Sequence, residues 1–179
     1  GLNLPNIPSF AKPARHAEVL LAHMVRFSAA LQGNFSGAIE WDALNLFFAP
    51  YLTEMSGKEV KQLAQLLVYE FSQLAFARGG QVMYTSMGLC WDVPDLFEKT
   101  PAIGPGGELT GKTYGEYAAQ AQRFACAILD TFLEGDATGR PFSFPKPLIH
   151  IGEKFFRTPG HEAFLLHACK LAAQKGNPF

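Results

Sequence analysis

The sequence predicts an α/β fold in which buried parallel strands alternate with amphipathic helices. Apolar stretches without a helical period, such as residues 81–90 and 142–151, alternate with segments whose apolar residues recur at helical spacing. Hydrophobic residues make up 48% of the 179 residues and charged residues only 17%, which excludes a disordered chain. Two or three strands are too few for a doubly covered sheet, so we expect further strands outside this chain.

Local signals divide the first half of the chain into four elements. Pro13 suits the start of a helix. Ser56 and Glu59 have the spacing of a capping box, in which each side chain accepts the other residue's backbone N–H. Gly79 and Gly80 end the helix that this box opens. The predicted elements are a helix over 14–32, a strand over 38–41, a short helix over 43–48 ended by Pro50, and a helix over 58–76.

The second half repeats the alternation. Thr113 and Glu116 form a second capping box, and Thr158 followed by Pro159 suits an N-cap with proline at the first helical position. The predicted elements are a strand over 81–90, a loop over 92–111, a helix to about 133, a turn over 135–140, a strand over 142–151 and a helix to about 174.

Charge and cysteine usage exclude several functions. The net charge of −1 gives no electrostatic basis for binding nucleic acid or an anionic membrane, and no apolar run is long enough to span a bilayer. Cys90, Cys126 and Cys169 form neither a zinc spacing nor an even disulfide set, so we expect buried, inert thiols in a reducing compartment. The histidines, His16 and His23 among them, are too far apart along the chain for one ion, and no metal site is predicted.

One motif suggests a nucleotide triphosphatase. Gly106-Gly107-Glu108-Leu109-Thr110-Gly111-Lys112-Thr113 matches the phosphate-loop pattern, in which backbone N–H groups and a lysine bind phosphates. A true phosphate loop leaves a buried strand directly, whereas Pro101 precedes this one, and Asp130 lies on the helix that the motif opens. A glycine-rich surface loop is the simpler interpretation, and the phosphate loop is kept as the alternative.

An ordered set of motifs resembles the anaerobic (class III, glycyl-radical) ribonucleoside-triphosphate reductases. The motifs lie at residues 46–52, 77–86, 101–107, 134–142, 144–147 and 175–178, and the resemblance covers all 179 residues. It implies a single segment of a ten-stranded α/β barrel, incomplete in this chain. It also implies a cytoplasmic oxidoreductase that supplies deoxyribonucleotides for DNA replication.

The resemblance implies the chemistry as well. A glycyl radical, installed by a radical-SAM activating enzyme, generates a cysteine thiyl radical. This radical abstracts the 3′ hydrogen from the ribose of a ribonucleoside triphosphate, and the 2′ hydroxyl leaves as water. The two catalytic cysteines and the radical glycine are expected outside these residues. No catalytic residue or cofactor is therefore assigned to this segment, and the isolated segment is expected to be inactive.

The resemblance places allosteric control in this segment. It implies a homodimer paired through the helices over 14–32 and 58–76, with a dNTP effector bound at the interface. The effector-facing positions are Lys12, His23, Tyr51 and Lys58. The loop Arg78-Gly79-Gly80-Gln81 is expected to transmit effector identity, because two glycines permit alternative backbone states. Thr85 and Ser86 are expected on the substrate side. A non-catalytic helical interaction module, which would show no dNTP-dependent dimerisation, stays open.

Overall fold

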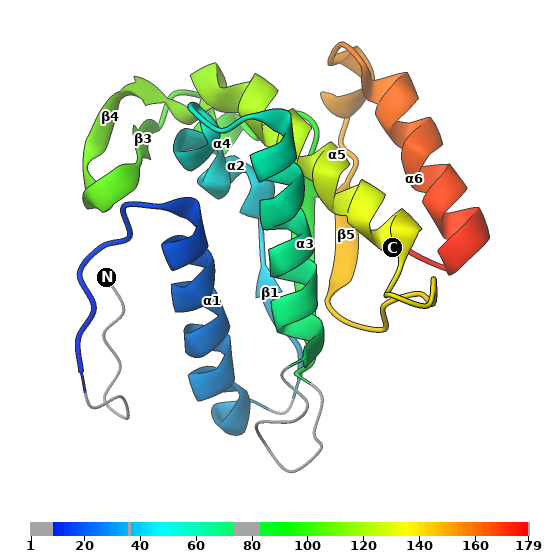
Figure 1. The fold of residues 1–179 in the computed structure, drawn as a ribbon. Coiled ribbons are helices and arrows are strands. Elements are labelled where there is room, and N and C mark those ends of the chain that lie inside the picture. The colour runs from blue at the N-terminus through cyan, green and yellow to red at the C-terminus, as the bar shows by residue number, and fades with distance from the viewer. Residues whose placement is uncertain (1–8, 36, 74–82, 179) are drawn as a thin grey trace.

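The computed structural model describes residues 9–35, 37–73 and 83–178, in which helices and strands alternate (Figure 1). The α-helices are α1 (Ala17–Leu31), α2 (Leu44–Phe48), α3 (Gly57–Gln73), α4 (Asp95–Glu98), α5 (Ala118–Glu134) and α6 (His161–Lys175). The strands are β1 (Ile39–Trp41), β2 (Thr85–Cys90), β3 (Pro101–Ile103), β4 (Leu109–Thr113) and β5 (Lys146–His150).

Three of the strands form a parallel sheet in the order β1-β2-β5, which confirms the predicted parallel pairing. The register places Glu40, Ser86 and Lys146 in one row across the sheet. Strands β3 and β4 pair separately as an antiparallel hairpin. The described residues therefore form a mixed α/β structure, and the ten-stranded barrel stays a prediction.

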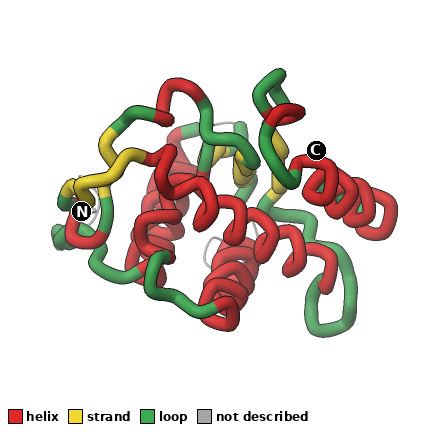
Figure 2. The backbone as a smooth tube through the Cα atoms, turned by 90° about the horizontal axis from the view of Figure 1, so that it is seen from above, coloured by secondary structure: helices red, strands yellow, loops and turns green. Residues whose placement is uncertain are grey.

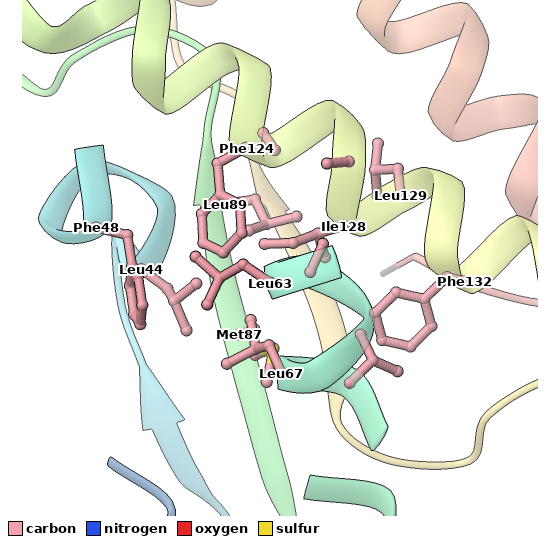
Figure 3. Packing of buried hydrophobic residues seen from close by; sticks show 14 of the residues in the cluster. Leu44, Phe48, Leu63, Leu67, Met87, Leu89, Phe124, Ile128, Leu129 and Phe132 are labelled. Atoms are coloured by element: carbon pink, nitrogen blue, oxygen red, sulfur yellow. The ribbon is translucent and has the colours of Figure 1, made fainter. Parts of the chain in front are cut away.

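Helices cover one face of this sheet. Met87 and Leu89 of β2 are fully buried and point toward Leu63 and Leu67 of α3 and toward α5 (Figure 3). Seen from above, α1, α3 and α5 lie on one side of the three strands (Figure 2). Each fully buried side chain of this size contributes about 1.5–3 kcal/mol relative to exposure. The packing of α3 and α5 on β2 is therefore the main source of stability in the described core.

The opposite face of the sheet is polar. Side chains alternate along a strand, so Ser86 lies opposite to Met87 and Leu89. Ser86 is half-buried, and Glu40 is exposed. The side chains of Asp42 and His150 are 68% and 49% exposed. We call this the polar face. It is the face of the sheet that α3 and α5 do not cover.

Both capping boxes are present as predicted. Ser56 N donates to Glu59 Oε2 at 2.7 Å, and Glu59 N donates to Ser56 Oγ at 3.3 Å. The Thr113–Glu116 box opens a 3₁₀ turn (Tyr114–Tyr117) that continues into α5. The predicted turn over 135–140 also forms, because Asp136 accepts backbone N–H groups from Thr138 and Arg140.

The predicted loop over 92–111 is wrong in its interior. It contains α4 and the β3–β4 hairpin, with Pro101 as the first residue of β3. Both strands of a two-stranded ribbon are edges, and an edge tolerates a proline that cannot donate to the ladder. This exception is why the sequence concealed the strand.

Helix boundaries differ from the predicted ones in three places. Helix α1 begins at Ala17, because the Ala14 carbonyl accepts from Gly106 N at 2.7 Å instead of starting a helix. Helix α2 ends at Phe48, but Pro50 does not end the helical conformation, because a 3₁₀ turn over Ala49–Leu52 follows directly. Helix α6 begins at His161 after Gly160, since the Thr158 hydroxyl donates to the Lys154 carbonyl and does not cap the helix.

One cysteine prediction is also wrong. Cys90 is buried and Cys126 is half-buried, but Cys169 is exposed on α6. Its neighbours Ala168 and Leu171 are buried, so the apolar stretch around it marks only one side of the helix. No helix among the described residues combines the length and apolarity needed to cross a bilayer.

Candidate functional site

His23 and Tyr51, both predicted as effector-facing, line the same groove. The groove has a volume of about 300 Å³ and lies between α1, Trp41 of β1 and the β3–β4 hairpin. Its wall is mostly apolar, with Met24 and Phe27 from α1. We call it the α1 groove. A mostly apolar groove with a few polar groups is typical of a site for a ring-shaped ligand.

Tyr51 is held in place by two carbonyl groups. Its hydroxyl donates toward the Gly104 oxygen at 3.0 Å, with the Ala14 oxygen at 3.4 Å. Burial, with a smaller contribution from Tyr114, raises the pKa of Tyr51, so it remains a neutral donor. Tyr51 therefore joins the segment before α1 to the β3–β4 hairpin at one end of the groove.

His23 is a half-buried side chain on α1. Burial, together with the nearby charge of Arg26, lowers the pKa of His23. The imidazole is therefore neutral at pH 7 and offers one donor and one acceptor. These groups suit hydrogen bonds to a base or a ribose better than they suit charge pairing with a phosphate.

A second hollow adjoins the α1 groove and was missed by sequence reasoning. It has a volume of about 400 Å³ and is lined by Arg15, His16, Gly106 and Glu108, among others. The chain neighbours of these residues, Ala14 and Gly107, line the α1 groove, so the two hollows share a wall. We call it the Arg15 hollow. The available signal was a basic pair directly before the apolar stripe of α1.

The shared wall requires glycine at one point. A Cβ on Gly107 would lie 2.9 Å from the Cβ of Pro13, and φ at Gly107 is +75°. Both the close approach and the positive φ favour glycine there. Gly106 and Gly107 of the phosphate-loop motif thus serve to dock the hairpin against the segment before α1.

Lys12 and Lys58 are both exposed. Within the described residues, neither lines the α1 groove or the Arg15 hollow. Lys58 lies in the first turn of α3. The structure therefore brings together His23 and Tyr51 but not the two lysines, whose predicted phosphate contacts stay predictions.

Thr85 and Ser86 lie at the start of β2, on opposite faces of the sheet. Thr85 is 1% exposed, and its hydroxyl has no hydrogen-bond partner in the described part of the chain. Ser86 pairs in register with Lys146 and lines a cavity of about 570 Å³ together with Lys146 and Phe144. Arg78, Gly79, Gly80 and Gln81 lie outside the described residues.

The phosphate-loop alternative does not fit the geometry. Residues Leu109–Thr113 form β4, which pairs with β3 instead of passing directly from a buried strand into a helix. The Gly106 N–H, which would cradle a phosphate, already donates to the Ala14 carbonyl. Lys112 lies over the Tyr117 ring at 5.7 Å. The glycine-rich stretch is a hairpin turn.

The family model for anaerobic ribonucleoside-triphosphate reductase matches residues 1–179. The chain belongs to this family. No curated relative matches it. The motifs quoted above therefore identified the family correctly, and the family is one of oxidoreductases.

Solved reductases share the fold. The anaerobic ribonucleotide reductase from Thermotoga maritima with glycerol in the active site aligns with a TM-score of 0.70, at 16% identity over 96% of this chain. The same enzyme in complex with dATP and CTP aligns with a TM-score of 0.67, also at 16% identity and 96% coverage. A third structure of it has dATP bound in the specificity site and aligns with a TM-score of 0.65.

The present chain spans about 30% of the length of these reductases. At this level of identity the likeness shows the shared fold. The family membership and the two adjoining hollows are the observations on which a function is argued.

Proposed function

We propose that this chain is part of an anaerobic ribonucleotide reductase that makes deoxyribonucleoside triphosphates by glycyl and thiyl radical chemistry. Its own part is to bind a dNTP specificity effector, to dimerise, and to carry the substrate-specificity loop. The observation that carries the proposal is the pairing of His23 and Tyr51 in one groove, in a chain whose whole length matches the reductase family. The glycyl radical and its activating enzyme act elsewhere in the full-length protein.

The effector lies across the two adjoining hollows. Its base and ribose occupy the α1 groove, where neutral His23 supplies a donor and an acceptor and Phe27 and Trp41 supply aromatic surface. Its triphosphate extends toward Arg15, whose guanidinium forms paired bonds with phosphate oxygens. Lys12 and Lys58 approach the phosphates from the same chain or from the partner. A related reductase with dATP bound in the specificity site supports this assignment.

The partner subunit packs on α1 and α3. These helices lie side by side (Figure 1) and correspond to the predicted dimer helices over 14–32 and 58–76. Val19 on α1 is 41% exposed although it is apolar, which suits a face that a second copy covers. A groove open along α1 is then closed by the partner, so effector binding and dimerisation support each other.

The polar face turns toward the interior of the ten-stranded barrel. Ser86 lies on this face, and Thr85 at the same strand end is buried, so Ser86 is the better placed of the two for substrate contact. The proposed relay of effector identity to the substrate is residues 78–81, which stand between α3 and β2 in the sequence. A coupling of about 1–3 kcal/mol changes substrate preference roughly 5–150-fold. Rearranging one or two hydrogen bonds is enough for that coupling.

Trp41 offers a direct test of effector binding, because it lines the α1 groove. The only other tryptophan, Trp91, stacks on Phe164, and Trp91→Phe leaves Trp41 as the sole reporter. We expect the tryptophan fluorescence of this variant to change with dATP concentration and to reach a plateau when the site is saturated. Adding Arg15→Ala or His23→Ala should weaken binding at least about 5-fold, the equivalent of one hydrogen bond. Lys170→Ala, an exposed cation on α6, is the matched control.

Two results would contradict the assignment. If Lys112→Ala loses dATP binding while Arg15→Ala keeps it, the phosphate loop is favoured. No dNTP-dependent dimer in sedimentation experiments would favour the interaction module.

In the complete enzyme, Gly79→Ala with Gly80→Ala should blur substrate choice and leave effector affinity nearly unchanged. Unaltered substrate choice would remove the role of that loop.

A further inference from the structure

Three metal-ligating side chains converge on the polar face near the carboxyl ends of β1 and β5. Glu40 lies in β1, Asp42 directly follows this strand, and His150 ends β5. One ligand atom from each lies within 4.8 Å of the other two. Asp42 Oδ1 and His150 Nε2 are 3.0 Å apart. Spacing along the sequence gave no sign of this cluster, because more than a hundred residues separate Asp42 from His150.

Gly88 on the central strand makes the convergence possible. A Cβ at this position would lie 2.8 Å from Asp42 Oδ1 and 2.8 Å from His150 Nε2. Gly88 is not among the described glycines with positive φ, so its backbone does not call for glycine. A Cβ here would displace the ends of these two side chains, and it would also lie 3.1 Å from the Asp42 Cα. The strand is thus shaped to let groups from both neighbouring strands meet above it.

The cluster also borders open space. Asp42 and His150 line a cavity of about 480 Å³ together with Asp92 and Phe97. An ion held by these side chains keeps coordination positions open toward the cavity for water or an anionic oxygen.

The donor set and its dimensions suit a transition metal. Two carboxylate oxygens and an imidazole nitrogen favour Mn²⁺, Fe²⁺, Co²⁺ or Zn²⁺ over Ca²⁺, which takes oxygen ligands. With bonds of about 2.1 Å, ligand atoms of a tetrahedral site lie about 3.4 Å apart. Asp42 Oδ1 and His150 Nε2 are 3.0 Å apart, so they must separate by about 0.4 Å to reach this spacing. Glu40 is exposed and needs only a side-chain adjustment of roughly 1–2 Å to reach it.

We propose that Glu40, Asp42 and His150 form a binding site for a divalent transition-metal ion, which Gly88 accommodates. The ion binds between Asp42 and His150 and is completed by Glu40 and by ligands from the cavity. This site is separate from the α1 groove and does not depend on the effector assignment.

The test is Mn²⁺ binding to the purified, chelator-treated protein, followed by loss of the free Mn²⁺ resonance signal and by calorimetry. We expect one site, from which Zn²⁺ displaces Mn²⁺, in line with the usual order of metal affinities. Asp42→Asn, His150→Gln and Glu40→Gln should each weaken binding at least about 10-fold. Asp92→Asn, a carboxylate in the same cavity but outside the cluster, is the matched control and should change affinity less than about twofold.

Gly88→Ala provides an independent variant, because it changes no ligand. Its added methyl group should weaken Mn²⁺ binding about as strongly as Asp42→Asn, with circular dichroism confirming that the fold is kept. The proposal is overturned if the unaltered protein binds neither Mn²⁺ nor Zn²⁺ at millimolar concentration, since the cluster is then only an Asp42–His150 hydrogen bond. It is equally overturned if Asp92→Asn weakens binding as much as the ligand variants do, because general negative charge then explains the affinity.

Discussion

Replacing Asn45 should destabilise the protein more than its small size suggests. Asn45 lies on α2 and is fully buried. Its amide nitrogen donates to the Cys90 carbonyl at 2.8 Å and the Ala121 carbonyl at 3.0 Å, and its oxygen accepts from Cys90 N at 3.0 Å. One side chain thus joins α2 to the end of β2 and to α5.

The magnitude follows from these three bonds. Each contributes about 1 kcal/mol net, and a buried backbone N–H left without a partner costs about 1–3 kcal/mol. Asn45→Ala should therefore lower the free energy of unfolding by about 3–5 kcal/mol. With a urea m value of about 2–3 kcal/mol/M, the unfolding midpoint falls by roughly 1–2.5 M. Urea titration followed by circular dichroism measures this shift.

Two further variants make the reasoning refutable. Asn34→Ala is the matched control, because its amide makes one exposed contact of 3.4 Å to the Ala30 carbonyl and its loss should cost less than about 0.5 kcal/mol. Asn45→Asp keeps an acceptor for Cys90 N but sets an anionic oxygen against two carbonyl groups, so it should destabilise as much as Asn45→Ala. If Asn45→Ala loses no more than Asn34→Ala, the buried bridge is not a stabilising element.

Three other predictions concern a turn, a cap and the thiols. Gly160→Ala should lower the free energy of unfolding by about 2–3 kcal/mol, measured by thermal unfolding, because φ is +81° and the new Cβ would lie 2.9 Å from Trp91. Gly139→Ala, where φ is +78° and no atom lies close to the new Cβ, should lower it by only about 1 kcal/mol. Equal losses would exclude the Trp91 contact as a cause. Hydrogen bonds from Ser56 lower the pKa of Glu59 in the folded protein. The contribution of the Glu59 carboxylate to stability is therefore complete above the ordinary pKa of glutamate, and it is lost as pH falls through the lowered pKa of the folded state. The stability difference between the unaltered protein and Glu59→Gln at pH 7 should therefore shrink as pH falls below the ordinary glutamate range and vanish once the folded carboxyl is protonated, and a difference that persists in acid would contradict the cap. Burial, with Asp42 and Asp92 nearby, raises the pKa of Cys90 to about 12, and burial also raises the pKa of Cys126. A thiol reagent at pH 8 should therefore label only the exposed Cys169 in the native protein and all three cysteines in denaturant. Rapid labelling of Cys90 would show that β2 opens readily.

The candidate site was predictable in part. His23 and Tyr51 were expected to act together because their positions in the chain resemble the effector-facing positions of the reductase family, and they line one groove. Arg15 was missed, because its relation to the β3–β4 hairpin arises from a fold contact between residues about ninety positions apart. The same reason hid the cluster of Glu40, Asp42 and His150, whose members no local spacing connects.

Elements whose causes are local could be predicted from the amino-acid sequence. Capping boxes at Ser56 and Thr113 act over three residues, and the apolar periods of α3 and α5 act over a few turns, so both could be seen without a structure. Three features could be seen only in the folded chain: where the hairpin after Pro101 docks, which side chain bridges α2 to β2 and α5, and which polar groups meet above Gly88. These features depend on contacts between segments far apart in the chain, and such contacts are set by how the whole core packs.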